Sequence, residues 1–147
     1  MMAEPHARKL RSGRHSLPGQ VYLLTTVTKG REPVFLDFGF ARMLIAVLRE
    51  QQDLQHAHTL AFVVMPDHLH WLMQLGERID LSLCMRNVKT MSARRLGRPV
   101  WQRGFHDHAL RQEQDLADVA RYVIANPVRA GLVQRTGQYP HWDAVWV

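Results

Sequence analysis

The chain has 147 residues, of which 46% are hydrophobic, and this length suits a single domain with one ordinary core. Its 19 Lys and Arg residues outnumber its 13 Asp and Glu residues, and the net charge of +6 is compatible with a nucleic-acid partner. The single cysteine excludes an intramolecular disulfide and a cysteine-based zinc site, and no apolar run reaches the length of a membrane span. We therefore expect a cytoplasmic protein with no membrane partner.

The N-terminal segment is polar and basic. Residues 1–18 are predicted to form a flexible arm, followed by a single domain over residues 19–147. The composition of the arm, which includes Arg14, fits a solvated tail and a DNA-contacting arm equally well.

The remaining pattern alternates between strand and helix signals. In chain order, the predicted elements are a strand over 21–28, a helix from Asp37 to about His56, a β-hairpin over 59–75 with its turn at Pro66-Asp67, a helix from Asp80 to Gly97, an irregular strand within 100–111, and a helix that begins near Asp115 and ends or bends at Asn126-Pro127. The tail to Val147 is expected to pack back on the domain. This β-α-β-β-α-β order predicts an α+β fold of the ferredoxin-like, split βαβ type, with a mainly antiparallel sheet, helices packed on one face and one added helix.

Two histidines open the second strand of the predicted hairpin. A spacing of two places His68 and His70 on one face of the strand, while the neighbours of the other parity are apolar and face the core. Such a pair on a rigid strand can hold a divalent metal. With nine histidines in the chain, however, the spacing alone favours ordinary surface residues, and His106 and His108 form a second pair of the same kind. We interpret this second pair as a polar patch or a DNA-contact region.

A stretch without acidic residues covers 86–103. Its cations are Arg86, Lys89, Arg94, Arg95, Arg98 and Arg103. A charged helix face is usually just solvated, but a stretch of one sign close to a histidine pair favours a surface that faces phosphates.

The last predicted helix carries a tyrosine beside its apolar face. Tyr122 lies at the margin of that face, and Asn126 follows four residues later on the same margin. The carboxamide oxygen of Asn126 can complete a three-ligand metal site with two imidazoles. From these residues alone, the better-supported interpretation is a packing tyrosine and a helix-ending asparagine before Pro127.

Three motifs in this order resemble the REP-associated tyrosine transposases, which are HUH (His-hydrophobic-His) single-strand DNA transposases. The motifs are Met65-Pro66-Asp67-His68-Leu69-His70, Trp101-Gln102-Arg103-Gly104-Phe105 and Arg121–Val133. The resemblance extends from about Arg14 to the C-terminal region. The ordered combination is specific, whereas His-Leu-His alone would be a weak signal.

The resemblance implies a ferredoxin-like core with the HUH motif on a central strand and the tyrosine on the added helix. It implies that His68, His70 and Asn126 hold Mg²⁺ or Mn²⁺. It also implies that Tyr122 attacks a phosphodiester of single-stranded DNA and leaves a 5′-phosphotyrosine and a free 3′-OH. The implied substrates are REP-type DNA hairpins with a short single-stranded tag, bound by Arg14 and the cations of 86–103. Within the family the chain looks more like a monomer than a dimer.

The leading hypothesis is thus a metal-dependent enzyme that nicks single-stranded DNA and transfers strands. One alternative is a non-catalytic module that binds structured single-stranded DNA. A second alternative is a metallohydrolase in which the metal activates water and Tyr122 is structural.

Overall fold

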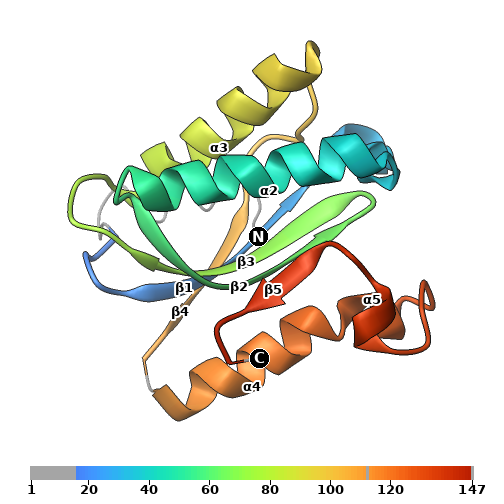
Figure 1. Cartoon of the computed structure of the whole chain (residues 1–147). Helices are drawn as coiled ribbons and strands as arrows, with labels where there is room; N and C mark the ends of the chain where they lie inside the picture. Colours follow the sequence, from blue (N-terminus) through green and yellow to red (C-terminus); the bar gives the residue numbers. More distant parts are fainter. Residues whose placement is uncertain (1–15, 112, 147) are drawn as a thin grey trace.

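The computed structural model describes residues 16–111 and 113–146, which form a five-stranded sheet with helices on both faces (Figure 1). Most of the predicted arm, with Arg14, therefore lies outside the described residues. The regular elements are β1 (Val21–Val27), α2 (Phe38–Asp53), β2 (Ala57–Met65), β3 (His68–Leu75), α3 (Leu81–Leu96), β4 (His106–Leu110), α4 (Glu113–Ile124), α5 (Asn126–Arg129) and β5 (Trp142–Ala144). Short 3-10 turns occupy Lys29–Arg31, Val34–Leu36 and Thr136–Gln138.

The strands are arranged in the order β4-β1-β3-β2-β5, and every neighbouring pair is antiparallel. The first six regular elements follow the predicted β-α-β-β-α-β order, so the α+β prediction is confirmed. The irregular segment before β4 is joined to the end of β1 by an isolated bridge between Thr28 and Trp101. The predicted return of the tail takes the form of β5, which adds to the outer edge of β2.

The helices α2 and α3 pack on one face of the sheet, as the sequence predicted. Asp37 caps α2 by accepting a hydrogen bond from the Phe40 amide, and Asp80 caps α3 through the Leu83 amide. Gly97 ends α3 with a φ of 78°, a conformation that glycine adopts readily. The main core lies between these helices and the β3 side chains Leu69, Trp71, Met73 and Leu75.

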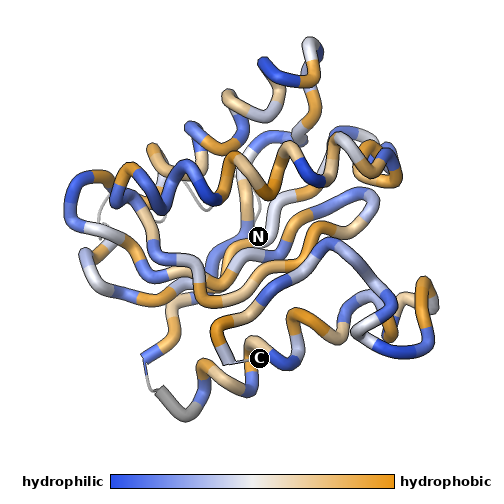
Figure 2. The backbone as a smooth tube through the Cα atoms, viewed as in Figure 1, coloured by the Kyte–Doolittle hydropathy of each residue, from blue (hydrophilic) through white to orange (hydrophobic). Residues whose placement is uncertain are grey.

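The added helix α4, for which the sequence predicted no particular face, covers the opposite face of the sheet (Figure 1). Ala120 of α4 packs with Leu72, and Val123 packs with Val63 and Met65. The physical reason is that β2 is apolar on both sides from Ala61 to Met65, with Leu72 of β3 beside it, so water must be excluded from both faces there. Figure 2 shows these hydrophobic strand segments between the two helical layers.

The described part of the chain contains no helix that is both long and apolar enough to span a bilayer.

Candidate metal and tyrosine site

The two histidines lie at the start of β3, the middle strand of the sheet. Their rings are 4.8 Å apart between centroids and meet edge to face. Because Leu69 belongs to the core under α2 and α3, His68 and His70 are on the face that α4 covers. The strand thus presents two imidazoles side by side, as the sequence predicted.

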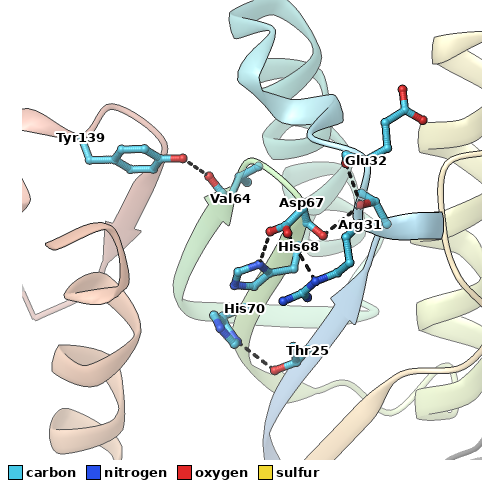
Figure 3. A network of polar contacts seen from close by, with 9 residues as sticks. Thr25, Arg31, Glu32, Val64, Asp67, His68, His70 and Tyr139 are labelled. Atoms are coloured by element: carbon cyan, nitrogen blue, oxygen red, sulfur yellow. Dashed lines mark hydrogen bonds and ion pairs between the residues drawn. The ribbon is translucent and has the colours of Figure 1, made fainter. Parts of the chain in front are cut away.

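Each imidazole is anchored through its Nδ1 atom (Figure 3). His68 Nδ1 is 2.7 Å from Oδ1 of Asp67, and His70 Nδ1 is 2.8 Å from Oγ1 of Thr25 on β1. Asp67 is held in turn by Arg31, whose Nε lies 3.4 Å from its other carboxylate oxygen. With Nδ1 engaged on both rings, Nε2 is the atom that each histidine can offer to a metal.

His70 is kept neutral by its surroundings. Burial, the neighbouring His68 and the positive charge of Arg129 lower the pKa of His70 to about 4. A neutral imidazole has the lone pair that a metal ligand needs, so His70 is in its ligating form at neutral pH.

Tyr122 differs from the other two tyrosines of the chain. Tyr22 is buried in the main core, and the Tyr139 hydroxyl donates to the Val64 carbonyl at 2.5 Å. Burial raises the pKa of Tyr139 to about 12. Tyr122, in contrast, is 58% exposed near the end of α4. It is therefore the tyrosine with the accessibility that a nucleophile requires.

The end of α4 lies beside the histidine pair. Val123, next to Tyr122, is buried against Val63 and Met65 of β2, whose register partners on β3 are His70 and His68. Residues opposite one another in an antiparallel pair share a face of the sheet. The tyrosine segment and the histidines thus occupy neighbouring positions on the α4 face.

Asn126 begins α5, one turn after Tyr122. Its amide nitrogen donates to the carbonyl oxygens of Val123 at 3.1 Å and Tyr122 at 3.5 Å. This leaves Oδ1 as the end of the carboxamide that can face a cation. Within residues 16–111 and 113–146, no three His, Cys, Asp or Glu side chains form a cluster that could hold a metal ion. Two imidazoles and an amide oxygen fit a divalent ion with open positions, and the nitrogen donors suit Mn²⁺ better than Mg²⁺.

Several residues of this site were not identified from the sequence. Asp67 lies within the first motif and could have been found as the neighbour of a histidine. Thr25 could not, because its contact depends on the register between β1 and β3. Arg129 lies within the third motif, but its sequence position gives no sign that it contacts Tyr122.

Replacing Asp67 with Asn is expected to weaken Mn²⁺ binding about 10–100-fold, the usual effect of removing the partner that orients a metal-bound histidine. Isothermal titration calorimetry measures this directly. Arg31→Ala is the matched control, because it removes the ion pair to Asp67 and leaves the Asp67–His68 contact. Equal affinity in Asp67→Asn and wild type would show that this contact does not serve a metal.

Most of the predicted DNA-binding cations border a groove between α3 and the segment 98–105, which we call the α3 groove. Its cations are Arg86, Lys89, Arg94, Arg98 and Arg103. The rings of Trp101 and Phe105 also line it. The α3 groove and the histidine pair are on opposite faces of the sheet, and Arg103 and Gly104 border both the groove and a small pocket beside Thr25.

Three of these predicted cations are engaged within the fold. Arg95 lies outside the groove lining and forms two hydrogen bonds, of 2.6 and 2.7 Å, with Glu50 of α2, which hold the pKa of Glu50 below its usual value. Arg98 pairs in the same way with Glu32. Lys89 donates to the carbonyl oxygens of Gln102 and Gly104, and burial lowers its pKa to about 8.

The second histidine pair lies on β4, at the edge of the sheet. His106 is the register partner of Thr25, and Thr25 is the partner of His70, so these three residues form a row across the α4 face. His108 pairs with Leu23 and is also exposed. The structure thus places His106 and His108 on the same face of the sheet as His68 and His70, away from the α3 groove.

Comparisons with known proteins identify relatives in sequence and in fold. REP-associated tyrosine transposase of Escherichia coli K12 is 26% identical over 130 residues, covering 86% of this chain and 78% of the relative. A curated relative from Haemophilus influenzae is 27% identical over 139 residues, covering 84% and 78%. A solved REP-associated tyrosine transposase bound to a REP hairpin superposes with a TM-score of 0.76 at 26% identity, covering 88% of this chain and 79% of that one.

A second solved structure, a transposase-like protein of Deinococcus radiodurans at 22% identity, shares the fold with a TM-score of 0.52 over 76% of this chain. The family described as Transposase IS200 like matches residues 19–126, which include the histidine pair, Tyr122 and Asn126. With most of its length matched, this chain belongs to the IS200-like transposase family.

Proposed function

We propose that the chain is a metal-dependent enzyme that nicks and rejoins single-stranded DNA at REP-type hairpins, with residues 19–147 as its catalytic domain. The observation that carries the proposal is an exposed tyrosine on a helix packed beside two anchored, neighbouring imidazoles. The family and the hairpin-bound relative support the substrate class.

In this proposal, Nε2 of His68, Nε2 of His70 and Oδ1 of Asn126 would hold the divalent ion. When bound, the ion would polarise the scissile phosphate and offset its developing charge. Asp67 and Thr25 fix the orientation of the imidazoles before the substrate arrives.

Tyr122 is the proposed nucleophile. Its phenol loses a proton, Oη forms a bond to phosphorus, the P–O3′ bond breaks, and the 3′ oxygen takes up a proton. One phosphodiester is exchanged for another, so attack by a second 3′-OH reverses the step without an external energy source. Because the histidines, Asn126 and Tyr122 come from neighbouring elements of the same chain, we propose that a monomer suffices.

Hairpin binding is assigned to the basic surfaces. We propose that Arg86, Arg94 and Arg103 of the α3 groove, with Arg14 of the arm, contact stem phosphates. The histidines of β4 would contact the strand that leads to Tyr122. The position of Arg103 between the groove and the Thr25 pocket gives a path around the edge of the sheet.

A denaturing gel of labelled REP hairpin DNA, incubated with protein and Mn²⁺ or Mg²⁺, tests the proposal. A DNA band that migrates with the protein and disappears with chelator is expected. Cleaved DNA without attached protein would indicate a metallohydrolase. Hairpin binding that weakens with salt but is unchanged by chelator, without DNA cleavage, would indicate a binding module.

Two adjacent arginines provide a test of the α3 groove. Arg94→Ala is expected to weaken hairpin binding and to reduce the slope of log affinity against log salt by about one unit, since one phosphate contact is lost. Arg95→Ala, which removes the pair to Glu50, should leave that slope unchanged and cost no more than about 1 kcal/mol of stability. Fluorescence anisotropy at several salt concentrations measures both, and equal slopes in both variants would remove the α3 groove from the DNA interface.

A further inference from the structure

Arg129 lies over the ring of the proposed nucleophile. The carbon at the centre of its guanidinium is 3.7 Å from the centroid of the Tyr122 ring. Its Nη2 atom also donates a hydrogen bond of 2.8 Å to the Tyr122 carbonyl oxygen. Two contacts to one residue fix both the guanidinium and the ring below it.

The break between α4 and α5 makes this contact available. The α4 helix ends at Ile124 and α5 begins at Asn126, so the carbonyl of Tyr122 lies in the last turn of α4, where backbone acceptors have no partner within the helix. This carbonyl accepts a hydrogen bond from the side chain of Arg129 together with a longer one from the side chain of Asn126. The same break therefore positions the proposed metal ligand and an arginine around one tyrosine.

The charge of Arg129 acts on the metal face of the site. Arg129 stacks on Tyr122, and the adjacent Val123 packs on Val63 and Met65. These two are the register partners of His70 and His68, so the guanidinium lies on the same face of the sheet as the histidines. Among the described residues, no carboxylate forms an ion pair with Arg129. A guanidinium has five N–H donors on three nitrogens. In Arg129, one nitrogen donates to the carbonyl of Tyr122, so the other two nitrogens can donate hydrogen bonds to an anion.

We infer that Arg129 binds a non-bridging oxygen of the scissile phosphate and holds the Tyr122 ring in line with the P–O3′ bond. This inference rests on the proposed function. During the step Arg129 neither gains nor loses a proton: its charge stays positive while the negative charge on the phosphate oxygens is redistributed. The planar fork of arginine suits this role, since it can stack on the ring and donate to phosphate at once.

The test compares variants in single-turnover cleavage of hairpin DNA. Arg129→Ala is expected to slow cleavage roughly 10²–10³-fold, as expected for removal of a donor to a developing anion. Arg129→Lys should recover part of the rate because it keeps the charge and loses the planar fork. Arg121→Ala is the matched control: it removes an exposed cation next to Tyr122 whose partner is Asp118, and it should cleave at nearly the wild-type rate.

A phosphorothioate at the scissile position separates phosphate binding from a structural role. In wild type, the diastereomer whose sulfur faces Arg129 should react more slowly than the all-oxygen substrate. Arg129→Ala should slow that diastereomer much less than it slows the oxygen substrate. Equal slowing of the oxygen substrate and both diastereomers, or wild-type cleavage by Arg129→Ala, would overturn the inference.

Thermal melting and hairpin affinity of each variant show whether folding or binding accounts for a slower rate. Arg129→Ala could cleave slowly because it is unfolded, while a folded Arg129→Lys or Arg129→Gln variant cleaves at the full wild-type rate. This result would also overturn the inference. If the wild-type protein gives no covalent adduct, the proposed function itself is overturned. If the wild-type protein forms the adduct and Arg129→Ala cleaves at the wild-type rate, only the inference about Arg129 is overturned.

Discussion

Tyr122→Phe is expected to give no protein–DNA adduct and to lower the rate of DNA cleavage by about 10⁴-fold or more, the usual scale for loss of a covalent nucleophile. The substitution removes one hydroxyl and keeps the ring that stacks under Arg129. Hairpin affinity and thermal stability should therefore stay close to those of wild type. A denaturing gel for the adduct and anisotropy for binding provide the measurements.

Tyr139→Phe is the matched control for this prediction. It removes the hydroxyl that donates to Val64, which should cost about 0.5–1.5 kcal/mol of stability. The adduct should still form, since this hydroxyl is occupied by the fold. Adduct formation by Tyr122→Phe and its loss in Tyr139→Phe would exchange the roles of the two residues.

The second large effect is expected from replacing both histidines. His68→Ala/His70→Ala should weaken Mn²⁺ binding by more than about 100-fold, because losing the ligands must exceed the 10–100-fold effect of losing their supporting partners. Cleavage should fall to the level of wild type in excess chelator. Both side chains face away from the main core, so the variant should fold.

Calorimetry with Mn²⁺ and the cleavage assay check this prediction together. His58→Ala, which removes an exposed imidazole of β2, is the control and should keep both metal binding and cleavage. If the double variant binds Mn²⁺ as wild type does, the metal site lies elsewhere.

The sequence was sufficient to predict the order and type of most elements. Local signals were strong where one residue decides a boundary: Asp37 and Asp80 cap α2 and α3, and Gly97 ends α3. It was not sufficient for the side of the sheet that α4 covers. That choice depends on how Val123 packs with Val63 and Met65, and helical periodicity does not say which sheet face an apolar stripe meets.

Prediction of the candidate site had the same limit. Spacing along one strand identified His68 and His70, and helical spacing linked Tyr122 to Asn126. Thr25 and Arg129 were missed because their contacts join β1 to β3 and α5 back to α4. Charge counting alone also could not separate Arg94, which lines the α3 groove, from its neighbour Arg95, which pairs with Glu50.

The contact between Thr25 and His70 has a consequence for how the protein matures. β1 and β3 are separated in the chain by α2 and β2, so their pairing is a long-range contact. A slip of one residue in this register would turn Thr25 towards α2 and α3, and His70 would lose its anchor. A chain in which this register has not formed has both histidines but no anchor for His70, so the proposed DNA cleavage would require a complete sheet.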